Sequence, residues 1–359
     1  MVKVLVVEDS PVIREFLVYI LSSDPEIQVI GTATNGEEAL TFLQQKWPDV
    51  ITMDINMPKM NGLEATRRIM ETAPVPIVIV SGSWNTAEVA TTFRAMEAGA
   101  VAVLPRPQGI GHAEHEATAK ELVQTVKLMS EVKVVKRWAR AQEGRREKLP
   151  GDIIPSVFEV EVESDTTNIQ VVALGASTGG PIVIQTILAG LSKNFPMPIL
   201  IVQHIAPGFV QGFVEWLART TGFSVRLAVH GEAMVPGHAY VAPDGVQMGV
   251  QKGDRIILNR EEPQNGLCPS VAYLFRTILN VYGRNAVGVL LTGMGKDGAQ
   301  ELKQMKDVGA ITIAQDQESS VVHGMPGEAI KLNGANYVLP SEKMASLLEK
   351  LVSKKRMAS

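Results

Sequence analysis

Short β-rich runs alternate with helical patterns along most of the sequence, and this alternation restricts the fold more than any other feature. In residues 1 to 107 the β-rich runs are KVLVV, IQVIGTA, DVITMD, PIVIVSG and AVAVLP. Helical patterns such as GEEALTFLQQK and GLEATRRIME separate them. Regular alternation of this kind is typical of βαβ units. We therefore predict an N-terminal α/β domain with a doubly wound, five-stranded parallel sheet covered by helices on both faces.

A basic, weakly apolar segment interrupts the alternation. EVKVVKRWARAQEGRREKLPGD ends in Pro-Gly and is typical of a solvated linker, although its positive charge could also bring it against acidic surfaces. From about residue 168 the alternation returns with QVVALGA, PILIVQH, SVRLAV, HAYVAPDG, DRIILNR, VGVLLTGMG and AITIAQD. Several of these runs are apolar throughout, as expected of parallel strands buried on both faces. We predict a first domain at 1–125, a linker at 126–167 and a second α/β domain with a mostly parallel sheet at 168–359.

Composition and charge exclude several classes of protein. A chain of 359 residues is too long for one ordinary domain, and its formal net charge of −4 gives no reason to expect nucleic acid as a partner. The single cysteine, Cys268, excludes an intramolecular disulfide framework and fits a reducing compartment. No apolar run approaches a membrane span, and MVKVLVVEDS enters a strand at once without a signal peptide. We expect a cytoplasmic protein without membrane insertion.

Polar side chains follow the strands of the first predicted sheet. Glu8 and Asp9 follow the first strand and Asp54 follows the third, while Ser81 ends the fourth and Arg106 follows the fifth. Open α/β sheets bind ligands outside the carboxyl ends of their strands. Converging carboxylates repel one another unless a cation joins them, and all-oxygen ligands suit Mg²⁺. Each acid alone could cap a helix, but five such residues at matching strand ends favour a functional site.

A second polar group follows the strands of the C-terminal half. VVALGASTGGP places Ser177 where a strand ends and a helix begins. The N–H groups of a helix start can hold a phosphate or stabilise an oxyanion beside a nucleophile, although serine and threonine also cap helices. His204 ends PILIVQH, the next strand, and Asp297 follows VGVLLTGMG. Because parallel strands end at one edge, the three residues can form a Ser-His-Asp triad.

Other interpretations of the second group compete on position alone. His112 and His115 lie after the strands of the first domain, in a loop or linker. The rival residues near strand ends or loops are His230, His238, His323, Asp244 and Asp316. GASTG matches the G-x-S-x-G nucleophile elbow, but the order Ser, His, Asp differs from that of α/β hydrolases and indicates another arrangement. A dinucleotide site is the main rival of another class. GASTGG lacks the G-x-G-x-x-G spacing, however, and no tyrosine is followed four residues later by lysine.

The N-terminal half resembles a response-regulator receiver domain, which has a flavodoxin-like fold. VVEDS, DVITMDINMPKMNG, VSG and GAVAVLPRP carry the resemblance. It implies that Asp54 accepts a phosphoryl group from a chemotaxis histidine kinase. It further implies that Glu8, Asp9 and Asp54 hold Mg²⁺ together with the backbone carbonyl of Asn56, and that Ser81 contacts the phosphoryl group and switches.

Residues 169 to about 350 resemble the catalytic domain of chemotaxis protein-glutamate methylesterases. GASTGG, IVQH, VAPDG, PSV and LLTGMGKDGA carry this resemblance, which together with the receiver and the linker covers nearly the whole chain. It implies that Ser177 is the nucleophile, His204 the base and Asp297 the orienting acid. It also implies that Thr178 and Met294 flank the site, with the Met294 backbone binding the oxyanion.

The sequence departs from the receiver family at one position and from the methylesterase family at two. The first is Arg106, where receivers usually carry lysine, so a rigid guanidinium fork replaces a compact ammonium. The second is Ala272 after PSV, where methylesterases often have aspartate. The third is His323 in VVHGMP, where an aromatic residue is common.

The resemblance implies a phosphorylation-regulated hydrolysis of glutamate methyl esters on chemoreceptors. Methanol leaves, an acyl-enzyme forms, and glutamines of the same receptors are deamidated. Mg²⁺ belongs to the receiver, whereas the esterase step uses no metal or other cofactor. The unphosphorylated receiver is expected to cover the active site. The alternative is an adaptor whose second domain binds receptors without turnover, and a serine-directed phosphonate distinguishes the two because a competent triad reacts with it.

Overall fold

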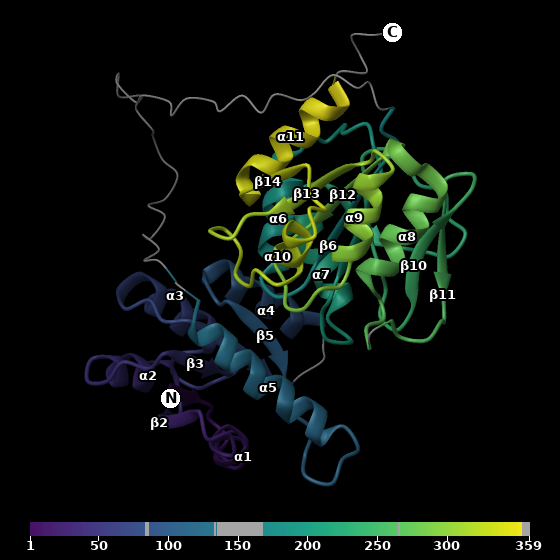
Figure 1. Cartoon of the computed structure of the whole chain (residues 1–359). Coiled ribbons are helices and arrows are strands. Elements are labelled where there is room, and N and C mark those ends of the chain that lie inside the picture. Colours follow the sequence, from purple (N-terminus) through teal and green to yellow (C-terminus); the bar gives the residue numbers. More distant parts are fainter. Residues whose placement is uncertain (83–85, 133, 135–167, 265, 354–359) are drawn as a thin grey trace, which may run out of the picture.

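The computed structural model describes residues 1–82, 86–132, 134, 168–264 and 266–353, which form two α/β domains (Figure 1). The N-terminal domain has a five-stranded sheet of order β2-β1-β3-β4-β5, in which every pairing is parallel. This confirms the predicted doubly wound sheet. Its strands are β1 (Val2–Val7), β2 (Ile27–Ala33), β3 (Val50–Met53), β4 (Ile77–Ser81) and β5 (Ala102–Pro105). Its helices are α1 (Pro11–Ser22), α2 (Gly36–Leu43), α3 (Gly62–Thr72), α4 (Thr86–Ala98) and α5 (His115–Ser130).

The C-terminal domain has a seven-stranded sheet of order β14-β13-β12-β6-β7-β9-β8, whose pairings are all parallel. Its strands are β6 (Val171–Ala176), β7 (Ile199–Gln203), β8 (Ser224–Leu227), β9 (His238–Val241), β12 (Ala286–Leu290), β13 (Ile311–Gln315) and β14 (Tyr337–Leu339). A separate antiparallel pair joins β10 (Gln247–Gln251) to β11 (Arg255–Asn259). The helical elements are α6 (Gly180–Gly190), α7 (Val210–Thr221), α8 (Val271–Tyr282), η1 (Gly283–Asn285), α9 (Ala299–Asp307), α10 (Met325–Lys331) and α11 (Ser341–Ser353).

Strand β6 lies in the middle of this sheet and is buried along its whole length. Its side chains alternate between two cores because successive residues of a strand point to opposite faces. Val172 and Leu174 belong to the core that includes residues of α6, α7 and α11, whereas Val171 and Ala173 belong to the core that includes residues of α8 and α9. A strand buried on both faces cannot carry polar side chains until it leaves the sheet. The first polar side chain after β6 is therefore Ser177, in the turn that follows the strand.

The structure differs from the sequence prediction in three details. Strands β10 and β14 were not predicted, and DRIILNR forms β11, which pairs with β10 outside the main sheet. Helix α5 ends at Ser130, so it extends past the boundary predicted at residue 125. Most of the predicted linker at 126–167 lies outside the described residues, and the proposed division of the chain stays a prediction.

The two domains contact each other through an aromatic cluster between α4 and α7. The ring of Phe93 on α4 stacks on Trp216 of α7 with centroids 5.3 Å apart and lies 5.6 Å from the ring of Phe213. Trp216 also donates a hydrogen bond from Nε1 to Glu97 Oε1 over 2.7 Å. Phe93 is 1% exposed and belongs to the hydrophobic core of the C-terminal domain. Helix α4 is thus held by the neighbouring domain as well as by its own sheet.

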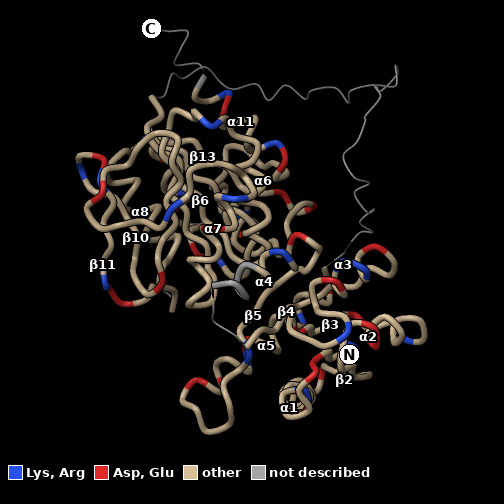
Figure 2. The backbone as a smooth tube through the Cα atoms, turned by 180° about the vertical axis from the view of Figure 1, so that it is seen from behind, with Lys and Arg blue, Asp and Glu red and all other residues tan. Residues whose placement is uncertain are grey.

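Charged residues lie mainly on helices and loops, with both signs interspersed over the two domains (Figure 2). Within the described part of the chain, no helix has the length and apolar character needed to cross a lipid bilayer.

Candidate active site

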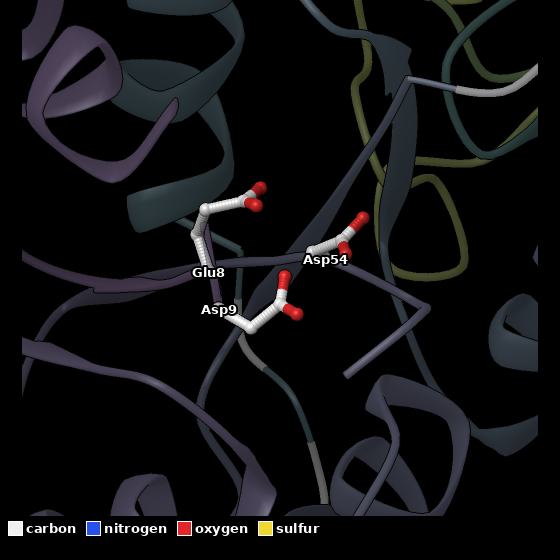
Figure 3. A group of neighbouring side chains, drawn as sticks. All are labelled: Glu8, Asp9 and Asp54. Carbon is white, nitrogen blue, oxygen red and sulfur yellow. The ribbon is translucent and has the colours of Figure 1, made fainter. Parts of the chain in front are cut away.

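The first predicted cluster forms where the order of the N-terminal sheet reverses, between β1 and β3. Glu8 and Asp9 follow β1 and Asp54 follows β3, and one carboxylate oxygen of each lies within 4.8 Å of the others. Figure 3 shows the three side chains converging from these two strand ends. Glu8 and Asp54 are buried whereas Asp9 is exposed, so the cluster opens to solvent on one side. The arrangement agrees with the general position of ligand sites in open α/β sheets.

The electrostatics of this cluster favour a bound cation. Burial, and next the negative charge of Asp54, raise the pKa of Glu8 to about 7. Burial likewise raises the pKa of Asp54, although Arg106 and the N–H groups of Ile55 and Asn56 lower it. Three carboxylates offering only oxygen ligands suit Mg²⁺, which would relieve their mutual repulsion. The residues present therefore fit a divalent cation.

The remaining residues predicted for this site surround the carboxylates. The Arg106 guanidinium lies 3.2 Å from Glu8 Oε2 and 3.9 Å from Asp54 Oδ1. It packs over Gly82, where a Cβ atom would lie 2.6 Å from Arg106 Nη1. Ser81 is buried at the end of β4, and its carbonyl accepts the backbone N–H of Arg106 over 2.9 Å. Asn56 is exposed in the loop that follows β3.

The second predicted cluster lies at the carboxyl edge of the seven-stranded sheet. Ser177 follows β6, His204 follows the neighbouring strand β7, and Asp297 follows β12 on the other side of β6. His204 Nε2 lies 2.9 Å from Asp297 Oδ2, and the two side chains are only 13% and 3% exposed. Among the described residues, no hydrogen bond joins Ser177 Oγ to His204, so that contact would have to tighten when a substrate binds.

The rival residues are bonded elsewhere. His230 Nδ1 lies 3.1 Å from the carbonyl oxygen of Leu258, and His323 Nε2 lies 3.2 Å from that of Gln315. Asp244 accepts the backbone N–H of Gly208 over 2.8 Å. Other hydrogen bonds to nearby residues in the sequence engage His112, His115, His238 and Asp316. Of the candidate histidines and aspartates, His204 and Asp297 are the pair that the structure joins.

Asp297 is held by the start of helix α8. Its Oδ1 accepts the hydroxyl of Ser270 over 2.9 Å and the N–H of Ala272 over 3.1 Å, while its Oδ2 accepts the N–H of Val271 over 2.7 Å. Burial raises the pKa of Asp297, but these backbone donors and His204 outweigh burial, so the pKa lies below its ordinary value. A helix N-terminus stabilises negative charge in the same direction. Asp297 is therefore a fixed, ionised partner for the imidazole.

Sequence reasoning missed Ser270. The stretch PSV is one of those that resemble methylesterases, but the sequence predicted no function for Ser270 itself. A serine directly before the apolar run VAYLFRTILNVY is a helix N-cap signal, and Ser270 Oγ does accept the Tyr273 N–H over 3.4 Å. Its contact with Asp297 joins positions 27 residues apart, which a local pattern does not reveal.

A glycine-rich turn holds Ser177 against the end of β12. The Ser177 N–H donates to the Thr292 carbonyl over 3.0 Å, and Thr292 Oγ1 donates to the Thr178 carbonyl over 2.9 Å. A Cβ atom at Gly293 would lie 2.6 Å from Ser177 Cβ, so the close approach requires glycine. Met294 follows this turn with its side chain 45% exposed. The predicted flanking residues Thr178 and Met294 thus lie on the two turns that meet at Ser177.

Comparison with known proteins agrees with this geometry. Residues 4–117 match the family model described as response regulator receiver domain, and residues 172–348 match that described as CheB methylesterase. A protein-glutamate methylesterase/protein-glutamine glutaminase of Syntrophus aciditrophicus is 58% identical over 351 residues, 98% of each chain. One from Nitrosospira multiformis is 56% identical over 361 residues, covering 99% of this chain and 98% of that protein.

A solved structure covers the second domain. The catalytic domain of the Thermotoga maritima CheB methylesterase superposes with a TM-score of 0.50 at 36% identity, over 51% of this chain and 99% of that one. Fold and site together define a response regulator whose receiver is joined to an α/β effector domain. The chain belongs to the family of protein-glutamate methylesterases/protein-glutamine glutaminases.

Replacing Ser270 tests whether its hydroxyl helps to keep Asp297 ionised. Ser270→Ala removes one donor, so the pKa of Asp297 should rise toward the ordinary value of about 3.9. Because this pKa is lower in the folded protein than in the unfolded chain, ionised Asp297 stabilises the fold above about pH 4, and the contribution disappears as pH falls through the folded pKa. Ser270→Ala should therefore lose more stability at pH 7 than at pH 3. Ser270→Thr, which keeps the hydroxyl, is the matched control.

The pKa itself can be followed by carboxyl ¹³C NMR, with Asp297→Asn identifying the resonance. An unchanged titration midpoint in Ser270→Ala would mean that the hydroxyl does not act on Asp297.

Proposed function

We propose that this protein hydrolyses glutamate methyl esters on chemoreceptors, deamidates glutamines of the same receptors, and is activated by phosphorylation at Asp54. The esterase activity is proposed on one observation. His204 and Asp297 are hydrogen-bonded at the sheet edge where Ser177 follows the neighbouring strand β6. The names of the full-length relatives support the same reaction. Chemoreceptors are then the substrate, and a chemotaxis histidine kinase is the phosphodonor.

The reaction divides into two steps. Ser177 Oγ attacks the ester carbonyl while His204 takes the serine proton, and the proton then passes to the departing methoxide, which leaves as methanol. His204 next removes a proton from water, which attacks the acyl-enzyme, and it returns this proton to Ser177 Oγ as the glutamate side chain leaves. Because Nε2 of His204 faces Asp297, Nδ1 is the nitrogen that exchanges protons with the serine. With glutamine as substrate, ammonia takes the place of methanol.

Backbone donors stabilise the oxyanion in this proposal. The N–H of Ser177 is already engaged by Thr292. Among the described residues, no hydrogen bond engages the N–H groups of Thr178 or Met294, which lie on the two turns beside Ser177. We assign the oxyanion to the Met294 N–H, with Thr178 beside it. The esterase step then uses no metal or cofactor, because these groups supply nucleophile, base and electrostatic stabilisation.

The receiver supplies the regulation. Asp54 accepts the phosphoryl group, and Glu8, Asp9, Asp54 and the backbone carbonyl of Asn56 would hold Mg²⁺. A cation bound there would screen the negative charges of the carboxylates and of the phosphoryl oxygens. Ser81 then contacts the phosphoryl group from the end of β4. The three carboxylates within 4.8 Å of one another support this assignment.

Removing the nucleophile tests the esterase. Ser177→Ala should abolish methanol release from methylated receptor while the protein stays folded, because loss of a triad nucleophile costs on the order of 10³ to 10⁶ in turnover. His204→Ala should come close to the same loss. If either variant kept more than about a tenth of the wild-type rate, that residue would be a structural one. If the wild type binds receptor but neither turns over nor reacts with a serine-directed phosphonate, the adaptor alternative holds.

Loosening the contact between the domains tests the regulation. If the unphosphorylated receiver restricts the active site, Phe93→Ala should raise activity without phosphodonor, because it removes the ring that stacks on Trp216. Each tenfold rise requires only about 1.4 kcal/mol of lost contact. Phe16→Ala removes a receiver ring that lies on His115 within the same domain, and serves as the matched control.

Asp54→Asn gives the unphosphorylated reference for this experiment. It should ignore acetyl phosphate with Mg²⁺, and adding Phe93→Ala to it should still raise the activity. A full chain with Phe93→Ala that is slower than wild type would mean that the receiver assists catalysis instead of restraining it.

Arg106→Lys tests the unusual cation of the receiver. The substitution replaces the fork that reaches Glu8 by an ammonium, and it leaves the triad untouched. We expect it to change the activation by acetyl phosphate more than the basal methanol release. Equal fold-activation of wild type and variant would show that arginine and lysine are interchangeable here.

A further inference from the structure

The side chain of Gln203 lies between the two turns that carry Ser177 and His204. Gln203 is the last residue of β7, and it pairs with Ala176, the last residue of β6. Ser177 and His204 are thus the first residues after this pair. One further backbone hydrogen bond, from the His204 N–H to the Ala176 carbonyl over 2.9 Å, ends this ladder. The two segments then separate, one into α6 and the other into the loop before α7. The sheet ladder alone does not fix how far apart the nucleophile and the base lie.

The amide of Gln203 closes this gap. Its Nε2 donates to the carbonyl oxygen of Ser177 over 2.8 Å and to that of His204 over 2.8 Å. An amide nitrogen has two hydrogens, so each carbonyl receives one. Both partners are obligate acceptors, which fixes the orientation of the amide. One planar group therefore links the backbones of the proposed nucleophile and base.

The surroundings of Gln203 leave the amide little freedom. The residue is 4% exposed, and its Oε1 has no hydrogen-bond partner among the described residues. A Cβ atom at Gly180 would lie 2.2 Å from that Oε1 and 2.6 Å from Ala176 Cβ. The amide thus occupies the space that a side chain at position 180, at the start of α6, would need. Any side chain at position 180 must displace it.

We propose that Gln203 is a positioning residue that sets the relative placement of Ser177 and His204, an inference that rests on the proposed esterase function. It touches neither substrate nor reacting atoms. It acts by holding the carbonyls of the two turns at a fixed distance, so that the serine hydroxyl and the imidazole meet when substrate binds. A misplacement of about 1 Å at a reacting group can cost about 100-fold in rate.

The test replaces the amide by an apolar side chain of similar length. Gln203→Met removes both donors, and kcat for methanol release from methylated receptor should fall about 10- to 100-fold with KM unchanged. A serine-directed phosphonate should still label every molecule, but more slowly. Counting active sites by this labelling separates a slower site from a smaller folded fraction.

A matched control removes another buried hydrogen bond made by a side chain of the same sheet, at the edge where its strands begin. Thr312 is fully buried near the start of β13, and its Oγ1 donates to Asn336 Oδ1 over 2.7 Å and accepts the Asn336 N–H over 3.0 Å. Thr312→Val should lower thermal stability while leaving kcat per labelled site at the wild-type value.

A second variant keeps the proposal testable if Gln203→Met fails to fold. Gly180→Ala leaves Gln203 in the sequence but pushes on its Oε1, and it too should lower kcat without raising KM. In a double-mutant cycle the two losses should not add, because both act through one amide. Wild-type kcat per labelled site in these variants would overturn the role of Gln203. Full activity of Ser177→Ala would instead overturn the esterase mechanism itself, so the two failures are distinct.

Discussion

The parallel pairing of β12, β6 and β7 is the constraint on which the second site depends. Three neighbouring strands that run in the same direction deliver their carboxyl ends to one edge, and that edge receives Asp297, Ser177 and His204. The strands can stay parallel only if both faces are buried, so their sequences must be apolar until the last residue. Chemistry is therefore confined to the turns. The N-terminal sheet obeys the same rule, with its carboxylates beyond β1 and β3.

Burying an ionised carboxylate is the main energetic difficulty of this arrangement. Asp297 is 6% exposed, and a buried carboxylate without partners would become protonated. The first turn of α8 prevents this by donating from Val271 and Ala272, and Ser270 adds its hydroxyl. His204 and this helix start together keep the pKa of Asp297 below its ordinary value despite burial. The turn after β12 can carry a buried carboxylate because the start of α8 lies within hydrogen-bond distance of it.

The sequence pattern was sufficient for most strands of the two main sheets and for placing His204 and Asp297 at strand ends. It left other histidines and aspartates open on position alone, and only the resemblance to methylesterases selected this pair. An apolar run followed by a polar turn and a helix gives the strand, its direction and the position of its end. Strand β14 was not predicted because a three-residue edge strand shows too little alternation. Strand β10 was not predicted because QMGVQ mixes polar and apolar residues. The contact of Ser270 with Asp297 was not predicted for another reason. Its role arises from packing of α8 against the β12 turn, and local propensity shows only a helix cap.

One loop belongs both to the contact between the domains and to the surroundings of Ser177. Val321 and Val322 pack against the core of the receiver, and the Val322 N–H donates to Thr292 Oγ1 over 3.0 Å. That hydroxyl in turn donates to the Thr178 carbonyl. A Cβ atom at Gly179 would lie 2.5 Å from Val321 Cγ2, so the valine rests directly on the turn of the nucleophile. Val321 therefore contacts both the receiver core and the turn that carries Ser177. The receiver and the turn that carries Ser177 thus share this one loop as a common contact.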